Sequence, residues 1–570
     1  MKNLEVAKLL YDIADMLDIL GEAFKPQAYR KAAKSIEGLG EDIEVYYKNG
    51  KLEEIPGVGK SISEKIIEFL ETGKSSYYEE LKKKVPGGVS TLIEIPGMGP
   101  KRAMYLYKNL GIKSIEELED AAKKGKLREL NGFGEKSEQD ILKGIEILRK
   151  GQERFLLGVA LPIAEEIVGR LKTLKEVQKI SIAGSLRRMK ETIGDLDILV
   201  VSNSPEKVMD FFTSMKEVQN IIAKGTTKSS VILKNNLQVD LRVIEDKSFG
   251  SALQYFTGSK EHNIALREIC KKKNLKLSEY GLFDKNDKMI AGKNEEDIYK
   301  KLGMQYIEPE LRENTGEIEA ALKGELPKLV NYNDIRGDLH IHSKWSDGDD
   351  EIRDIAIEAK KLGYEYIAIS DHSKSQKIAH GLSYEDLEKR NKEIDSLNEK
   401  LPIRILKGME VDILPDGSLD YDDNILKKLD VVIVSVHSRF KSTKEEMTKR
   451  ILKALENPYV NILGHPTGRL ITSRIEYEVD IEKIIKKAKE NNVALEINAN
   501  PERLDLKDVY VRLAVNSGAK LAIGTDAHSK LHLGFIKLGV ATARRGWAEK
   551  KNIINTLSLK ELKEFLKKKS

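Results

Sequence analysis

The chain has 570 residues, of which 40% are hydrophobic and 33% charged, a composition typical of folded domains and a length that suits three or four of them. No apolar run reaches the ~20 residues of a membrane span, the N-terminus does not read as a signal peptide, and a lone cysteine excludes a disulfide framework, so we expect a cytoplasmic protein. The net charge of +5 permits nucleic-acid binding without requiring it, and eight of the nine histidines lie at residue 340 or later, which indicates two chemically distinct halves.

Residues 1–150 are predicted to be helical, with units at 1–75 and 76–150, and to contain three glycine loops: IPGVGK (55–60), IPGMGPK (95–101) and LNGFGEK (130–136). Glycine permits positive φ, so successive amides of such a loop can point at one phosphate without reading a base. One such loop is as often a structural turn, but three related loops favour phosphate binding. They resemble helix-hairpin-helix motifs, and the expected DNA-backbone contacts are Gly57, Gly59, Gly97, Gly99, Gly132 and Gly134.

Residues 151–245 change to an α/β pattern, with a helix followed by the strands KISIAGS, LDILVVS, SVILKN and LQVDLRVI. Asp195 and Asp197 face the same way on one strand, and Asp240 on another strand can complete a set of three carboxylates. Such a set can hold two Mg²⁺ or Mn²⁺ ions that bridge to a triphosphate and activate an attacking hydroxyl. The expected phosphate contacts are the residues before this strand, Gly184, Ser185 and Arg188. The alternative, a surface Asp-x-Asp beside a turn, leaves the Gly-Ser pair and Asp240 unexplained.

The segment YFTGSKEHNIALR (255–267) narrows this nucleotidyltransferase pattern, and with it the chain strongly resembles the X-family DNA polymerases, of which polymerase beta is a familiar member. The resemblance implies a palm at 151–245, a nucleotide-selecting subdomain at 246–315, a gap-binding domain at 1–75 and a duplex-binding subdomain at 76–150. It also implies that Tyr255, Phe256 and Gly258 line the sugar of an incoming dNTP. Asn263 would contact the minor-groove edge of that nucleotide, and Arg267 would contact the template side.

The sequence departs from the family pattern at two positions. Ala160 stands where the animal enzymes carry a further triphosphate-contacting arginine. By the resemblance, Lys65 aligns with the lysine that excises a deoxyribose phosphate, and Lys25 and Tyr29 also match, but Ser61 replaces a basic neighbour that helps to bind the 5′ phosphate. Lyase chemistry at Lys65 is therefore a hypothesis that competes with an ordinary solvated lysine.

Residues 316–335 are polar and irregular and are predicted to be a linker. After them, residues 336–570 alternate strands and helices in seven units, which predicts a parallel α/β barrel, a distorted seven-stranded relative of the TIM barrel. The predicted fold class of the whole chain is therefore multidomain, α followed by α/β.

Histidines and acids stand at or just after the ends of the barrel strands, beginning with GDLHIHSKWSDG (337–348). Because the C-terminal ends of parallel strands meet at one mouth, these side chains can share a pocket. Nitrogen and oxygen ligands in this number suit two or three Zn²⁺, Mn²⁺ or Fe ions, which would activate water and polarise a phosphate for phosphoester hydrolysis. The candidate ligands are His340, His342, Asp347, His372, Glu410, His437, His465, Asp526 and His528.

This second pattern resembles the polymerase-and-histidinol-phosphatase (PHP) domain, with all nine ligand positions filled. His380 and Arg469 lie in loops and are candidates for contact with a substrate phosphate, whereas His262 and His532 are expected not to be ligands.

Together the resemblances cover essentially the whole chain, in the order found in bacterial and archaeal X-family polymerases with a C-terminal PHP domain. They imply a monomeric DNA polymerase that binds gapped or primed DNA and dNTPs and fills short gaps in base-excision repair. They also imply a 3′→5′ exonuclease or 3′-end processing activity, to which incision at abasic sites would be an addition. Two alternatives stay open: a DNA 3′-end hydrolase with a weak or vestigial polymerase site, and a regulatory phosphatase of small phosphates, against which the three glycine loops speak.

Overall fold

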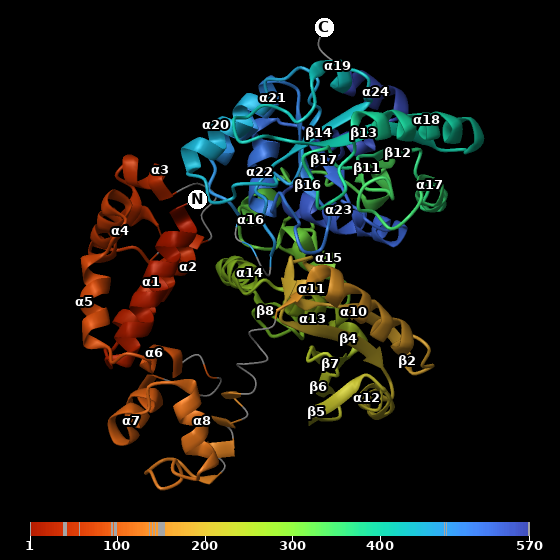
Figure 1. Cartoon of the computed structure of the whole chain (residues 1–570). Helices are drawn as coiled ribbons and strands as arrows, with labels where there is room; N and C mark the ends of the chain where they lie inside the picture. Colours follow the sequence, from red (N-terminus) through yellow and green to blue (C-terminus); the bar gives the residue numbers. More distant parts are fainter. Residues whose placement is uncertain are drawn as a thin grey trace.

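The computed structural model describes residues 2–37, 43–55, 57–92, 95, 98, 100–135, 137–139, 141–142, 144–145, 154–471, 474 and 476–567. Figure 1 shows an N-terminal run of helices, a central α/β region and a C-terminal barrel in chain order. Within the described part of the chain, every helix is too short or too polar to span a bilayer.

The N-terminal helices enclose two small apolar cores. In the first, residues at helical spacing on one face, Leu10, Ile13 and Leu17, are buried against α2 and α4. In the second, Leu106 and Leu118 are buried. The elements are α1 (Lys2–Ile19), α2 (Lys25–Glu37), α3 (Ile43–Lys48), η1 (Leu52–Glu54), α4 (Lys60–Thr72), α5 (Ser76–Lys84), α6 (Val89–Leu92), α7 (Pro100–Leu110) and α8 (Ile115–Lys123).

The palm is a five-stranded sheet in the order β2-β4-β7-β6-β5, and its apolar face is covered by α10 and α12. The predicted strands are present, and β5, which was not predicted, adds an edge whose side chains are mostly exposed. The elements are β1 (Phe155–Leu156), α10 (Leu157–Leu171), β2 (Val177–Ile182), α11 (Gly184–Arg187), β3 (Thr192–Ile193), β4 (Asp195–Ser202), α12 (Pro205–Thr213), β5 (Val218–Lys224), β6 (Lys228–Leu233) and β7 (Gln238–Ile244).

The next subdomain adds a three-stranded antiparallel sheet, β10-β9-β8, to the mixed helices and turns expected there. Part of the segment predicted to be irregular forms helix α16, because Ile318 and Ala321 are buried in the core of this subdomain. The elements are η2 (Asp246–Ser248), α13 (Phe249–Thr257), α14 (Lys260–Lys272), β8 (Lys276–Ser278), β9 (Gly281–Phe283), β10 (Met289–Ala291), α15 (Glu295–Lys301), η3 (Pro309–Leu311), α16 (Glu317–Lys323) and η4 (Tyr332–Asp334).

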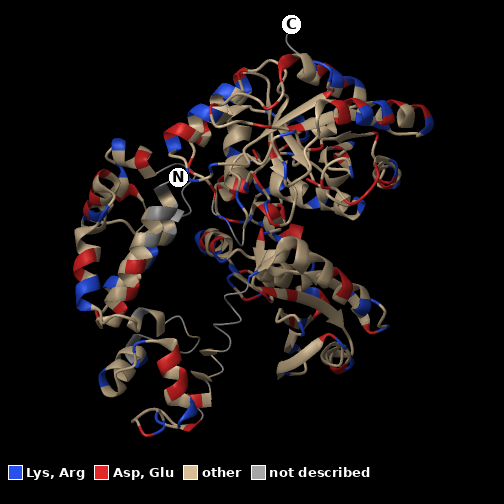
Figure 2. Cartoon of the chain, viewed as in Figure 1, with Lys and Arg blue, Asp and Glu red and all other residues tan. Residues whose placement is uncertain are grey.

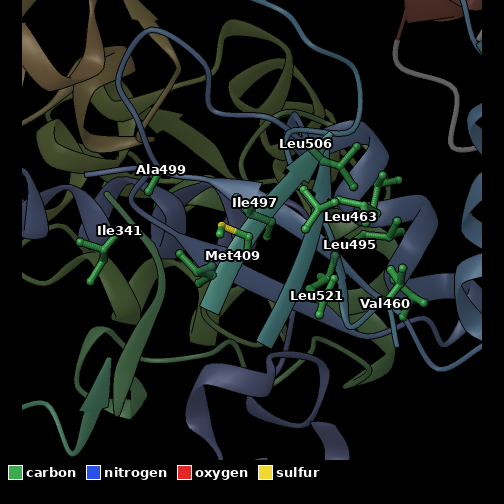
Figure 3. Packing of buried hydrophobic residues seen from close by; sticks show 14 of the residues in the cluster. Ile341, Met409, Val460, Leu463, Leu495, Ile497, Ala499, Leu506 and Leu521 are labelled. Atoms are coloured by element: carbon green, nitrogen blue, oxygen red, sulfur yellow. The ribbon is translucent and has the colours of Figure 1, made fainter. Parts of the chain in front are cut away.

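The C-terminal domain confirms the predicted seven-stranded parallel barrel, with strands β11 to β17 adjacent in chain order. A bridge from Ile341 to Ala527 brings the first strand beside the last, so the barrel is nearly closed. Figure 3 shows apolar side chains such as Met409, Leu495 and Ile497 packed around these strands.

The barrel strands are β11 (Gly337–Ile341), β12 (Tyr366–Ile369), β13 (Arg404–Asp412), β14 (Val431–Ser435), β15 (Ile462–Leu463), β16 (Ala494–Asn498) and β17 (Leu521–Gly524). The helices are α17 (Ile352–Lys361), α18 (Tyr384–Lys400), α19 (Asp423–Leu426), α20 (Lys444–Ala454), α21 (Ile481–Glu490), α22 (Asp508–Ser517), η5 (Lys530–Phe535), α23 (Ile536–Arg545), η6 (Lys550–Asn552), η7 (Ile554–Thr556) and α24 (Leu559–Leu566).

The palm and the barrel share an apolar seam. Leu504 and Leu538 of the barrel are buried in the same cluster as Leu157 and Leu161 of α10. In Figure 1, α23 accordingly runs along the side of the barrel that faces the palm. This packing holds the two candidate sites in a defined relation to each other.

Candidate active sites of the palm and the barrel

The three palm aspartates lie on two central parallel strands. Asp195 and Asp197 are on β4, and Asp197 is directly paired in register with Asp240 on β7. Asp240 Oδ1 accepts a hydrogen bond from Gln238 Nε2 at 3.0 Å, and its Oδ2 lies 3.2 Å from Lys228 Nζ. The strands thus bring together the carboxylates that the sequence predicted to act together.

Electrostatic repulsion and burial both act on these carboxylates. Burial, followed by the negative charges of Asp195 and Asp240, raises the pKa of Asp197 to about 7, and burial also raises the pKa of Asp195. A divalent cation would relieve this repulsion, so the oxygen-only donor set fits Mg²⁺ or Mn²⁺.

Gly184 closes the palm site from one side. Its φ is +65°, and a Cβ built on it would lie 2.5 Å from Asp197 Oδ2. Any side chain at this position would therefore collide with the carboxylate, which explains the glycine before Ser185.

The predicted nucleotide contacts lie on α13 and α14 and are partly engaged with one another. The rings of Tyr255 and Phe256 pack edge to face with centroids 5.1 Å apart. Asn263 Nδ2 donates to the Tyr255 carbonyl oxygen at 2.7 Å, and Asn263 Oδ1 accepts from Gln254 Nε2 at 2.7 Å. Arg267 Nε donates to the carbonyl oxygen of Asn263 at 3.2 Å. These bonds hold the α13–α14 corner as one unit.

Arg188 is bound by two acceptors at the same corner. Its Nε donates to Glu313 Oε1 at 3.0 Å, and its Nη1 donates to the carbonyl oxygen of Thr257 at 2.5 Å. A Cβ on Gly258 would lie 3.2 Å from Arg188 Nη1. The guanidinium predicted to bind phosphate thus lies against the loop predicted to bind the sugar.

In the N-terminal region, the first glycine loop leads directly into helix α4. Gly57 has φ +90°, and Gly59 is the N-cap residue of α4. In the third loop Gly132 has φ +84°, and Gly134 follows two residues later; Gly97 and Gly99 of the second loop lie outside the described residues. Figure 2 shows basic and acidic residues interleaved along these helices.

Lys65, the candidate lyase nucleophile, lies on α4. Its Nζ donates to the carbonyl oxygen of Ser61 at 2.9 Å and to Ser61 Oγ at 3.0 Å, and it lies 4.7 Å from the ring centroid of Tyr77. The Tyr29 ring stacks on the Tyr77 ring with centroids 6.3 Å apart, while Lys25 Nζ lies 3.0 Å from Glu22 Oε2.

In the barrel, the strand ends bring all nine predicted ligands into one cluster. Glu410 lies at its centre: Oε1 is 2.9 Å from His465 Nε2, and Oε2 is 3.0 Å from His372 Nδ1. The ligands form three groups, and within each group the ligand atoms all lie within 4.8 Å of one another. The groups are His342, Asp347, His372 and His528; His340, His342 and Asp526; and His372, Glu410 and His437. Within the described ranges only the barrel holds groups this close, so the palm aspartates are more widely spread.

The hydrogen bonding of the barrel cluster is incomplete without a further partner. In the described part of the chain, the buried nitrogen atoms His340 Nε2, His342 Nδ1 and Nε2, His372 Nδ1 and His465 Nδ1 make no hydrogen bond. A buried nitrogen that makes no hydrogen bond is costly, and imidazole nitrogen beside carboxylate is the donor set of Zn²⁺, Mn²⁺ or Fe. The barrel residues therefore fit a cluster of such ions.

Charge pairing across the barrel cluster is strong. Burial disfavours the charged form of His437, but Glu410 and Asp412 raise its pKa to about 10. Burial also opposes ionisation of Glu410, yet the surrounding histidines hold its pKa well below the usual range. Burial together with the neighbouring His372 lowers the pKa of His342 to about 4.

Two orienting carboxylates were not identified from the sequence. Glu496 Oε1 accepts from His340 Nδ1 at 2.6 Å, and its Oε2 accepts from the His465 main-chain N–H at 2.6 Å. Asp412 Oδ1 is 2.6 Å from His437 Nδ1. The alternation in MEVDI, which places Asp412 on the same strand face as Glu410, was the one available signal for Asp412.

The remaining candidates lie in other surroundings. Arg469 Nη2 donates to Glu191 Oε2 of the palm at 2.8 Å and to the carbonyl oxygen of Leu504 in the barrel at 2.6 Å, so these groups compete with any substrate phosphate. His262 is buried between Glu317 and Tyr299. The ring of His532 stacks on Phe535.

Sequence comparisons agree with this two-site architecture. Family models match at residues 1–75 (helix-hairpin-helix domain), 89–146 (SAM-like helix-hairpin-helix tandem), 252–313 (DNA polymerase beta thumb) and 338–500 (PHP domain). The chain is 42% identical over 573 residues to the DNA polymerase/3′-5′ exonuclease PolX of Bacillus subtilis (strain 168), covering 100% of both proteins.

The chain belongs to the PolX family. Parts of it are also similar to other proteins. Over 229 residues it is 32% identical to a probable phosphatase of Thermoanaerobacter sp. (strain X514), covering 38% of this chain and 88% of that protein. DNA polymerase lambda of Rattus norvegicus is 24% identical over 340 residues, covering 55% of this chain and 56% of that protein. The resemblances to X-family polymerases and to the PHP domain, both identified from the sequence, thus agree with the relatives found by comparison.

Proposed function

We propose that this chain is a DNA-directed DNA polymerase that fills short gaps, and that its barrel is a metal-dependent 3′→5′ exonuclease or 3′-end processing enzyme. The observation that carries this proposal is the full-length 42% identity to a PolX named for both activities, in a chain that carries both predicted ligand sets. Base-excision repair is the setting that such a pair of activities suits.

In the palm, Asp195, Asp197 and Asp240 would hold two Mg²⁺ or Mn²⁺ ions. Ions so held would lower the charge of a triphosphate and activate the primer hydroxyl. Ser185 and Arg188 would bind the phosphates, while Tyr255 and Phe256 would pack against the sugar of the dNTP. Asn263 and Arg267 would contact the base pair being formed. The corner hydrogen bonds that join Asn263 to Tyr255 and Arg267 support this arrangement, because they make the proposed nucleotide contacts a single rigid surface.

In the barrel, the nine ligands would hold two or three Zn²⁺, Mn²⁺ or Fe ions, which supply a nucleophilic hydroxide and a Lewis acid for phosphodiester hydrolysis. The protein's own contribution is orientation: Glu496 fixes the ring of His340, and Asp412 fixes the ring of His437. Abasic-site incision would use the same centre.

DNA would be gripped through its backbone by the glycine loops, with Gly57 and Gly59 best placed because they precede the N-terminus of α4. We propose a monomeric cytoplasmic protein. A lyase step at Lys65 would require release of the amine from Ser61, with which it now shares two hydrogen bonds.

The alternative is a 3′-end hydrolase with a weak polymerase site. One observation favours it: Lys228 Nζ already lies 3.2 Å from Asp240 Oδ2. This contact competes with a metal ion for that carboxylate.

A 5′-labelled primer on a one-nucleotide-gapped duplex, incubated with dNTPs and Mn²⁺ and resolved by length, separates the two readings. We expect template-directed extension that Asp240→Ala abolishes, with shortening retained in that variant. His340→Ala should abolish shortening and keep extension. Shortening without extension in the native chain would favour the hydrolase reading instead.

A further inference from the structure

Charged side chains from both domains meet where the barrel touches the nucleotide side of the palm. Glu313, shortly after η3, accepts on Oε1 from Arg188 Nε at 3.0 Å and from Arg545 Nη1 at 3.0 Å. Arg545 is the last residue of barrel helix α23, and its Nη2 donates to Asp508 at the start of α22 at 2.5 Å. Lys190 Nζ lies 3.9 Å from Glu313 Oε2. The side chains of Arg188 and Arg545 are 13% and 5% exposed, so water screens these pairs weakly.

Arg545 contacts the main chain of Arg188 directly and the side chain of Arg188 indirectly, through Glu313. Its Nη1 also donates to the main-chain oxygen of Arg188 at 2.9 Å, while Glu313, which it shares, binds the Arg188 side chain. Arg188 in turn donates to the Thr257 carbonyl oxygen, directly before Gly258. A barrel residue therefore fixes both the backbone and the guanidinium of a palm residue beside the proposed nucleotide loop.

The cluster has an excess of positive charge. It contains three cations, Arg188, Lys190 and Arg545, and two carboxylates, Glu313 and Asp508, so one cation has no counterpart within it. Burial lowers the pKa of Lys190, and the nearby Arg545 lowers it further, as expected where positive charge is under-compensated. An anion bound beside Arg188 would balance the cluster.

We propose that Arg545 is a positioning residue for nucleotide addition. Through Glu313 and the Arg188 backbone, this barrel residue fixes the position of the Arg188 guanidinium, which binds the dNTP triphosphate. This inference rests on the proposed polymerase function. It gives the hydrolytic domain a second role, as part of the structure that determines dNTP affinity in the palm.

A matched pair of variants tests this role. Arg545→Met removes the link, whereas Arg544→Met removes the neighbouring buried arginine of α23, which pairs with Glu310 at 2.7 Å and with the Val330 carbonyl oxygen at 3.0 Å. Single-nucleotide incorporation on gapped DNA gives kcat and the KM for dNTP, and 3′-end shortening and Tm are measured on the same samples. We expect Arg545→Met to raise the dNTP KM about tenfold, with kcat within about twofold and shortening unchanged. Arg544→Met should leave the dNTP KM unchanged.

Two further variants keep the test decisive. Glu313→Gln should raise the dNTP KM similarly and add little to Arg545→Met, because both act through Arg188; Arg545→Lys should recover part of the loss. If Arg545→Met does not fold, Glu313→Gln decides alone. An unchanged dNTP KM, an equal rise in Arg544→Met, or a parallel loss of extension and shortening would overturn the inference. A native chain that never extends a primer would refute the proposed function itself.

Discussion

Replacing Glu496 with glutamine tests how the barrel orients its metal ligands. Glu496 is fully buried, and each of its oxygens accepts a hydrogen bond at 2.6 Å, one from His340 Nδ1 and one from the His465 main-chain N–H. A glutamine of the same shape keeps only one acceptor oxygen, so in either orientation its NH₂ group faces an N–H donor. We therefore expect the His340 ring to lose its fixed orientation while the fold persists.

The size of the effect follows from what such partners contribute elsewhere. Loss of a carboxylate that orients a metal-bound histidine costs about 10–100-fold in metal affinity, or roughly 1.4–2.7 kcal/mol. The Mn²⁺ midpoint for 3′-end shortening should rise by that factor in Glu496→Gln, with primer extension unchanged at saturating Mg²⁺. Glu476→Gln, which alters a barrel carboxylate bound to Lys507 and Tyr510, is the control. An unchanged Mn²⁺ midpoint, or an equal loss of both activities, would refute the reasoning.

Three further predictions concern other parts of the chain. Glu295→Gln should lower the free energy of unfolding at pH 7 by about 3–5 kcal/mol in urea, because the buried Arg312 loses its anion; equal stabilities at pH 7 would contradict this. Burial opposes ionisation of Glu295, yet Arg312 and Arg187 hold its pKa at about 2, below the ordinary 4.5. The difference in free energy of unfolding between the native chain and Glu295→Gln should therefore be fully present above pH 4.5 and disappear as the pH falls through 2. Gly57→Ala, at φ +90°, should weaken binding to gapped DNA several-fold by fluorescence anisotropy; unchanged affinity would remove this loop from the interface. EDTA should lower the Tm of metal-loaded protein by several degrees, with recovery on adding Zn²⁺ or Mn²⁺, because the barrel imidazoles lose their partner; a Tm indifferent to EDTA would argue against resident ions.

The barrel could be predicted closely because its signals are local and periodic. Every barrel strand except β16 is a short apolar run that ends in or near a predicted ligand, so both the strand and the direction of its C-terminal end are encoded within about ten residues. The alternation of Asp195 and Asp197 likewise fixes their common face. Helix α16 was harder to predict, because its burial of Ile318 and Ala321 depends on a core assembled from distant segments.

The contacts that could not be predicted join residues far apart in the sequence. Glu496 is 156 residues from the histidine that it orients, and it stands in a strand of buried apolar residues where a carboxylate has no local signal. Arg188 is 125 residues from Glu313 and 357 from Arg545. The Glu496 pairing is set by closure of the barrel, and the Arg188 contacts by how the palm packs against the following subdomain and the barrel. No local periodicity reports either.

The two sites differ in how their own residues treat a metal ion. In the palm, burial and then the charges of Asp195 and Asp240 raise the pKa of Asp197 to about 7. Near neutral pH an incoming ion therefore competes with a proton, and the site gains from the extra oxygen ligands of a triphosphate. In the barrel, imidazoles already surround Glu410 and hold its pKa well below the usual range, while several buried imidazole nitrogens of the described residues make no hydrogen bond. Under the proposed function, the palm would take up ions with each nucleotide and the barrel would retain its ions. Synthesis and hydrolysis would then be controlled separately in one chain, the first by dNTP and the second by access of a 3′ end.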